Sequence, residues 1–142
     1  ANIKWPDNIF FFDKKIEKIP FYKDGELVAM IHGISYEKRD VEENLSQYFS
    51  KSDLCYNIAL LHTDLGGDNY APCKKEELIN KGFDYWALGH VHNRKVIHEK
   101  NPVILYPGNT QARSIKETGE KGVFLVEVKN NVVTVCLETM IE

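Results

Sequence analysis

The sequence predicts an α/β fold, because two continuous apolar runs are separated by a short helical pattern. The runs are Asn57–His62 and Tyr85–Gly89, and each is typical of a strand that is covered on both faces. Between them, Lys74–Lys81 has one apolar side and is followed by Gly82, a residue type that often stands just after a helix end. Strand, helix and strand at this spacing indicate a βαβ unit with two parallel strands.

Further strands are expected on both sides of this unit. Asn8–Phe12 is a short run rich in strand formers, and Ile16–Tyr36 resembles two strands joined at Asp24-Gly25, a strong hairpin signal. Two more hairpins are predicted near the end of the chain: Arg94–Glu99 with Val103–Tyr106, and Gly122–Val128 with Val132–Leu137 about the turn Lys129–Asn131.

One further helix is predicted between the first hairpin and the βαβ unit. Asp40 has the character of an N-cap, with Glu43 three residues later as in a capping box. Val41, Leu45, Tyr48 and Phe49 then follow at the spacing of a single apolar helix face. We expect this helix to end near Ser50.

Composition limits the class of protein. The chain has 142 residues, of which 43% are hydrophobic and 27% charged, as in an ordinary globular domain or a substantial piece of one. A formal net charge of −3 argues against a protein that wraps DNA by charge alone, although a bound metal or a local patch can still attract phosphate. Three widely spaced cysteines, and no long apolar run or signal peptide, favour a reducing, cytoplasmic location.

Three histidines stand at the ends of the two central strands. His62 ends the first run, and His90 and His92 follow the second. Because ligands of open α/β sheets bind outside the carboxyl ends of the strands, these imidazoles should converge on one edge. Each has a plainer explanation: a lone histidine there is usually a hydrogen-bonded rim residue, and a His-x-His pair can be exposed by chance. Gly89 permits a tight turn before the pair, and the three together favour a metal site.

Other polar residues carry weaker signals. We expect His32 and His98 to be structural. Arg94 could reach a substrate phosphate or be a surface arginine, and Asn109 and Gln111 could line a substrate cleft or satisfy their own loop.

Several motifs, in order, resemble those of one family. Ala87–His92 contains the Gly-His-x-His motif of the calcineurin-like metallophosphoesterases, and Leu60–Thr63 is similar to their preceding single-histidine motif. Four strings are similar to the bacterial DNA-repair exonucleases of the YhaO and SbcD type: Tyr70–Cys73, Asp84–His90, Tyr106–Asn109 and Glu117–Gly122. The similarity is strong from about Asn57 to Val128 and looser before that.

The resemblance implies a sandwich of two mixed sheets with flanking helices, and a centre of two divalent metals, usually manganese. His62 and His90 would bind one metal and His92 the other, and the two ions would hydrolyse phosphodiester bonds at DNA ends. It also implies an ATPase subunit as a partner. A phosphatase or cyclic-nucleotide phosphodiesterase on the same scaffold is an alternative, and a non-catalytic module that docks a partner is another.

The sequence departs from the family pattern in one large respect. The family opens with Asp-x-His, Gly-Asp-x-x-Asp and Gly-Asn-His motifs, and none of these occurs in the chain. We therefore expect residues 1–142 to be the C-terminal part of such a domain, with its βαβ core at about 57–91. Without the missing ligands, the chain alone should be inactive and bind at most one zinc or nickel ion weakly. A sheet edge left bare would favour homodimerisation.

Overall fold

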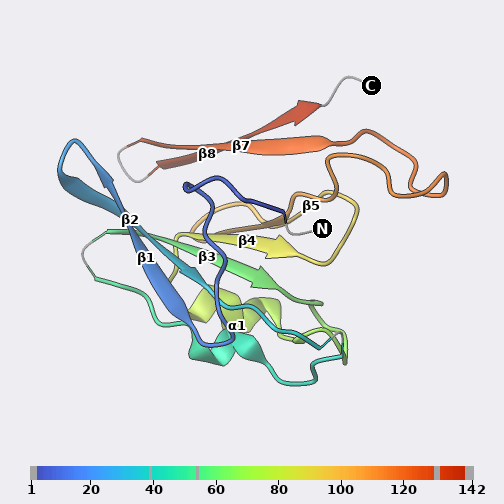
Figure 1. The fold of residues 1–142 in the computed structure, drawn as a ribbon, viewed down its shortest axis with the longest axis horizontal. Coiled ribbons are helices and arrows are strands. Elements are labelled where there is room, and N and C mark those ends of the chain that lie inside the picture. The colour runs from blue at the N-terminus through green and yellow to red at the C-terminus, as the bar shows by residue number, and fades with distance from the viewer. Residues whose placement is uncertain (1–2, 39, 54, 130–131, 140–142) are drawn as a thin grey trace.

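The computed structural model describes residues 3–38, 40–53, 55–129 and 132–139, and it is built on a six-stranded mixed sheet (Figure 1). The sheet has the strand order β1-β2-β3-β4-β6-β5. Its strands are β1 (Glu17–Lys23), β2 (Glu26–Gly33), β3 (Tyr56–His62), β4 (Tyr85–Gly89), β5 (Lys95–His98) and β6 (Val103–Tyr106). The four inner strands are parallel, and the two edge strands are antiparallel to their neighbours.

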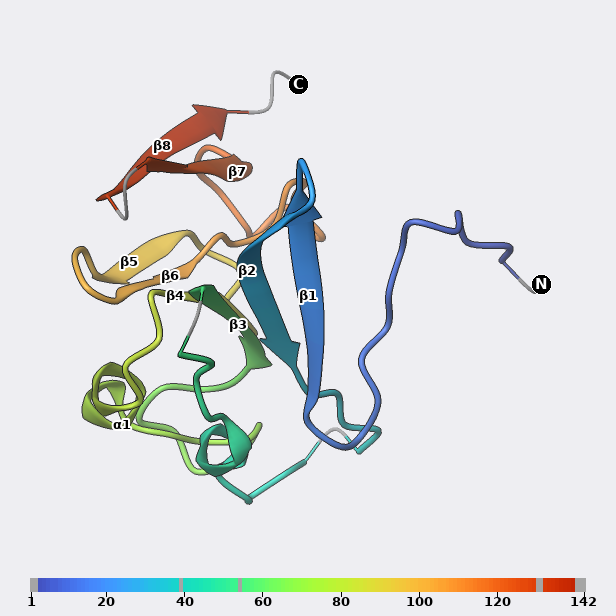
Figure 2. The ribbon, with the colours of Figure 1, turned by 90° about the vertical axis from the view of Figure 1, so that its left-hand side faces the viewer.

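The remaining elements form layers on the two sides of this sheet. The helix α1 (Lys75–Asn80) and the 3-10 helix η1 (Leu45–Tyr48) lie on one side. The hairpin of β7 (Gly122–Lys129) and β8 (Val132–Thr139) lies on the other, on the side of β4, β5 and β6 (Figure 2). The predicted α/β class, the βαβ unit and the three hairpins are confirmed. The tip of the last hairpin, Asn130 and Asn131, is outside the described residues.

The main core lies between the sheet and the helical side. Alternate residues of the central strands face it, because side chains on a strand alternate between its two faces. This core consists of Ile34, Leu45, Phe49, Ala59, Leu61, Ala71, Cys73, Leu78, Phe83, Trp86, Leu88, Ile104 and Tyr106. The opposite face is unevenly covered: Val103 and Leu105 are buried, whereas Leu60 is 39% exposed. The prediction that β3 is covered on both faces is therefore wrong within this chain.

The predicted helix from Asp40 to Ser50 is also wrong. Only Leu45–Tyr48 forms a helical turn, and its N-cap is Asn44, whose side chain accepts from the Ser46 N–H at 3.0 Å. The reason is a tertiary hydrogen bond. The Val41 carbonyl accepts from the backbone N–H of Ala71 at 2.6 Å, so it is not available to an α-helix.

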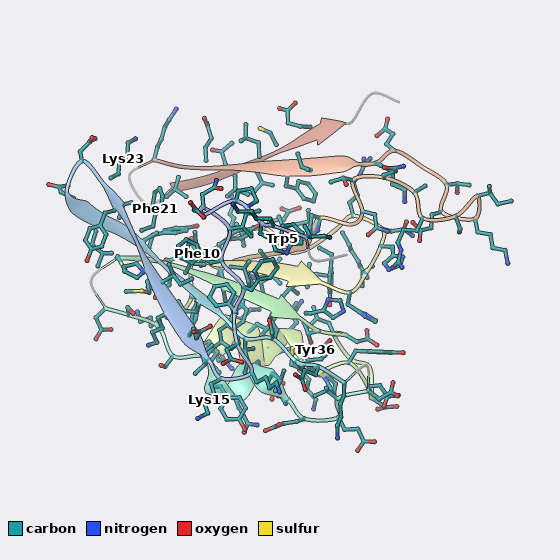
Figure 3. All side chains as sticks on the ribbon, viewed as in Figure 1. Trp5, Phe10, Lys15, Phe21, Lys23 and Tyr36 are labelled. Atoms are coloured by element: carbon teal, nitrogen blue, oxygen red, sulfur yellow. The ribbon has the colours of Figure 1, made fainter. Side chains whose placement is uncertain are left out.

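The N-terminal run Asn8–Phe12 does not form the predicted strand. The side chains of Phe10 and Phe11 are 68% and 66% exposed. Figure 3 shows Phe10 on this segment and Trp5 shortly before it, and the N-terminal stretch runs separately from the sheet in Figure 2. Its attachment is local: the Phe12 ring occupies the space where a Cβ on Gly33 would lie, and Ser35 N–H donates to the Asp13 carbonyl at 2.9 Å. Among the described residues, no strand pairs with this segment to form a ladder.

His32 is a buried structural residue, as predicted. Its Nε2 lies 2.9 Å from Oδ1 of Asn57, and its ring packs edge-on against Phe83. The Asn57 amide nitrogen donates to the carbonyls of Ser52 and Cys55, so Oδ1 is an acceptor and His32 is the donor. Burial lowers the pKa of His32 below its usual 6.5, and Lys18 acts in the same direction.

We expect the free energy of unfolding to fall as the pH is lowered from about 7 to about 5. The folded state favours neutral His32, so the unfolded chain takes up a proton at a higher pH than the folded chain does. Urea unfolding at several pH values measures this slope, which should be shallower in a His32→Gln variant. A variant with the same slope as the wild type would contradict the assignment.

No helix in the described parts of the chain is long and apolar enough to cross a membrane.

Candidate functional site

Three histidines from the carboxyl ends of β3 and β4 line one cavity. The strands are parallel and in register, with His62 opposite Gly89, so the residues after β4 continue beside the end of β3. The cavity has a volume of about 490 Å³ and is lined by Tyr36, His62, Tyr70, His90, His92 and Arg113. The prediction that His62, His90 and His92 bind metal stays a prediction, but the structure does bring the three to one place.

His90, one of the residues that line the cavity, has an unusual backbone conformation. Its φ is +111°, a region that residues with a Cβ rarely adopt. The ring of His90 stacks on Tyr70 with a centroid distance of 4.7 Å and meets the ring of His62 edge-on at 5.3 Å. Strain of this kind persists where surrounding contacts hold it, and it is found mostly at functional sites.

The role of Gly89 differs from the predicted one. His90, and not Gly89, has the positive φ. Gly89 instead leaves room for the side chain of His62. A Cβ on Gly89 would lie 3.0 Å from Nδ1 of His62. The glycine therefore lets the His62 ring lie close to β4, which brings it near His90.

The surroundings of His62 favour its neutral form. His62 is accessible to solvent through the cavity mouth, yet the protein atoms around its ring still remove part of its hydration. This desolvation lowers the pKa of His62, and His90 and His92 lower it further. A neutral imidazole can offer a nitrogen lone pair to a metal ion near neutral pH.

The donor set fits part of a metal site. Two imidazoles on one tetrahedral ion would have centroids about 5 Å apart, and His62 and His90 are 5.3 Å apart. However, none of the described residues that line the cavity is a carboxylate. Among the described residues, no group of three or more His, Cys, Asp or Glu side chains could hold a metal ion. His62 and His90 could therefore share an ion, which would need further ligands.

His92 is held by Glu117, a residue that the sequence reasoning did not select. Nδ1 of His92 lies 2.7 Å from Oε1 of Glu117. The Arg113 backbone N–H and the His92 ring lower the pKa of Glu117 to about 2, with help from Asn109, so its side chain is a carboxylate at neutral pH. In the sequence, Glu117 stood out only as the first residue of the family-like string Glu117–Gly122. That string has no periodicity that would place it beside His92.

The three weaker candidates lie outside the cavity lining. The guanidinium of Arg94 forms an ion pair with Glu120 at 2.9 Å. Asn109 donates from its side chain to Glu117 at 3.1 Å and from its backbone to the His92 carbonyl at 3.0 Å. Gln111 is exposed. The arginine that does line the cavity is Arg113. It was not predicted, because nothing in the sequence of its loop indicates which of the polar side chains there enters the cavity.

Comparison with known proteins agrees with the motifs. No family model matches the chain. Over 134 residues it is 44% identical to "Uncharacterized metallophosphoesterase YhaO" of Bacillus subtilis (strain 168), a match that covers 90% of this chain and 33% of that protein. The chain thus spans about a third of the length of the curated relative. This similarity, together with the histidine cavity at the sheet edge, supports the predicted link between this chain and the metallophosphoesterase superfamily.

Proposed function

We propose that this chain supplies the histidine side of the active site of a metal-dependent phosphoesterase. The observation that carries the proposal is the single cavity in which His62, His90 and His92 lie with Arg113. Imidazole suits divalent transition metals, and a guanidinium suits phosphate. Similarity to a relative named as a metallophosphoesterase supports the same chemistry.

In this proposal the ligand roles follow the family resemblance. His62 and His90 hold one divalent ion, and His92 holds a second, with the remaining ligands supplied from outside the residues of this cavity. A bound pair of such ions supplies Lewis-acid activation of the phosphate and a hydroxide nucleophile at neutral pH. Manganese is the metal that the resemblance favours.

The residues of the chain itself would position the substrate. Among the described residues, Arg113 is the one Lys or Arg in the cavity lining, and it can form paired hydrogen bonds with two phosphate oxygens. Tyr36 and Tyr70 form apolar walls beside the imidazoles, since Tyr70 stacks on His90 and Tyr36 meets His62 edge-on at 5.8 Å. These contacts help to hold the orientation of the His62 and His90 rings.

We propose a phosphodiester at a DNA end as the substrate, following the exonuclease-like strings in the sequence. The test uses four substrates: a bis-aryl phosphodiester, linear DNA, a cyclic nucleotide and an aryl phosphomonoester. Hydrolysis is measured with manganese and after chelation, both for this chain and for the product of its complete reading frame. Chelator-sensitive cleavage of linear DNA supports the proposal. Preference for the phosphomonoester or the cyclic nucleotide would favour the alternative enzymes, and no hydrolysis at all would favour a non-catalytic module.

Arg113 gives a sharper test of substrate binding. We expect Arg113→Gln to raise KM for linear DNA by about 10- to 100-fold, the loss that follows removal of a charge-assisted hydrogen bond. Arg94→Gln is the matched control, because Arg94 pairs with Glu120 and does not line the cavity. Steady-state kinetics give the KM for linear DNA of each variant, and we expect the rise in Arg113→Gln alone. A larger effect at Arg94 than at Arg113 would contradict the assignment.

We further propose homodimerisation along β1, which is an edge strand of the sheet. It exposes Phe21 and Tyr22, at 53% and 59%. Pro20 offers no N–H and the register shifts between Phe21 and Tyr22, so strand pairing would be short and side chains would carry most of the contact. We expect light scattering to give a dimer that Phe21→Glu converts to a monomer. A wild-type monomer over the accessible concentration range would remove the proposal.

A further inference from the structure

Glu117 uses both of its carboxylate oxygens, and the two oxygens serve different groups of the cavity. Oε1 lies 2.7 Å from Nδ1 of His92. Oε2 accepts from the Asn109 side-chain amide and from the Arg113 backbone N–H, each at 3.1 Å. Lys121, whose side chain is only 7% exposed, lies 4.0 Å from the same oxygen. The carboxylate is thus surrounded by donors.

This arrangement determines which nitrogen of His92 carries the proton. An ionised carboxylate can only accept hydrogen bonds. Nδ1 of His92 must therefore be the donor, and in a neutral ring Nε2 is then left with its lone pair free. Because the ring of His92 lines the cavity, the free lone pair is the one that a ligand in the cavity can use.

The backbone around His92 is fixed separately. The Asn109 N–H donates to the His92 carbonyl at 3.0 Å. A Cβ on Gly108 would lie 2.7 Å from both the His92 carbonyl oxygen and the Arg94 nitrogen, so only glycine permits this close approach. The loop that carries Glu117 is thus anchored to the backbone at His92, and the carboxylate adds control of the ring itself.

We propose that Glu117 is the positioning residue of this site: through Oε1 it holds His92 as the Nδ1–H tautomer, and through Oε2 it holds Arg113 at the cavity. The inference deepens the proposed function, on which its catalytic meaning rests. It assigns a role to the string Glu117–Gly122. One carboxylate then couples a metal ligand to the residue that binds the substrate phosphate, although these groups are far apart in the sequence.

The test is the tautomer of His92, read from the nitrogen chemical shifts of the imidazole in the metal-free protein. Spectra are recorded at about pH 9, where imidazoles are neutral. We expect Nδ1–H in the wild type. In Glu117→Gln the side chain has one acceptor oxygen, which the Arg113 N–H needs, so the amide NH₂ should face His92 and the ring should switch to Nε2–H. Glu120→Gln is the matched control and should leave His92 unchanged, because Glu120 pairs with Arg94.

A second measurement follows the same signal during titration with zinc chloride. We expect Glu117→Gln to weaken zinc binding by about 10- to 100-fold, the usual effect of removing the partner of a metal-binding histidine. Glu117→Asp keeps the carboxylate and should retain the wild-type tautomer, which separates positioning from folding.

An Nε2–H tautomer in the wild type would overturn the inference, even if no variant folds. An unchanged tautomer in Glu117→Gln would overturn it as well. Neither measurement needs catalysis. A protein that hydrolyses no phosphoester but shows the expected tautomers would refute the proposed function and uphold the role of Glu117.

Discussion

Replacement of His90 by alanine should reduce kcat/KM for phosphodiester hydrolysis by more than about 100-fold. Loss of a residue that only supports a metal ligand costs about 10- to 100-fold, so loss of a ligand should cost more. The ring of His90 lies against the rings of both His62 and Tyr70 in the cavity lining. The measurement compares wild type and His90→Ala in the product of the complete reading frame, over a range of manganese concentrations.

His98→Ala is the control for the loss of a histidine outside the cavity. His98 lies in β5, and its Nδ1 is 2.6 Å from the Pro102 carbonyl oxygen. This variant should keep its catalytic activity when it is folded. His90→Ala with activity within about threefold of the wild type, a difference of under 1 kcal/mol, would contradict the proposed centre.

His90→Gly separates function from stability. The backbone at His90 has a φ of +111°, which costs a residue with a Cβ about 1–3 kcal/mol and costs glycine little. We expect the glycine variant to be inactive and at least as stable as His90→Ala. Such a result would mean that the strained backbone at His90 serves the function of the site and does not stabilise the fold.

Replacement of Trp86 by alanine should lower the free energy of unfolding by about 3–5 kcal/mol, the range measured for large aromatic residues in cores. Trp86 is fully buried in β4 and packs on Phe49 and Phe83, with centroid distances of 5.1 and 4.9 Å. A domain is stabilised by only about 5–15 kcal/mol in total. The variant should therefore be at least partly unfolded at physiological temperature.

Urea unfolding followed by circular dichroism measures this loss. Trp5→Ala is the matched control, because Trp5 is 52% exposed and contacts Phe11 at the surface. Trp86→Phe should cost less than Trp86→Ala, because it keeps an aromatic ring and removes Nε1, a buried atom with no hydrogen-bond partner among the described residues. A loss below about 1 kcal/mol in Trp86→Ala would mean that the core lies elsewhere.

The central part of the fold was predictable because its signals are local. The apolar runs of β3 and β4, the helix between them with Gly82 at its end, and the Asp24-Gly25 turn each specify a backbone conformation through residues that are close in sequence. Parallel strands then bring their carboxyl ends together, which is why His62, His90 and His92 could be assigned to one edge before the structure was described.

The errors have a common cause. The segment Asp40–Ser50 has the apolar spacing of a helix, but its Val41 carbonyl pairs with Ala71, a residue 30 positions away in the chain. Propensity is a weak preference, and a tertiary hydrogen bond outweighs it. The run Asn8–Phe12 has the composition of a strand, but a strand needs a neighbour, and its residues have none within the described chain.

The sequence by itself determined the α/β class, the βαβ unit, the hairpins and the three histidines, because periodicity and turn chemistry act over a few residues. Only the tertiary structure decided which polar residues accompany those histidines. It placed Arg113 rather than Arg94 in the cavity lining, gave the positive φ to His90, and set Glu117 against His92. These contacts depend on the path by which the loop with Arg113 and Glu117 returns to the sheet edge, and that loop has no periodicity that would predict its path. Hydrogen bonds between residues far apart in the chain also leave no pattern in a single sequence.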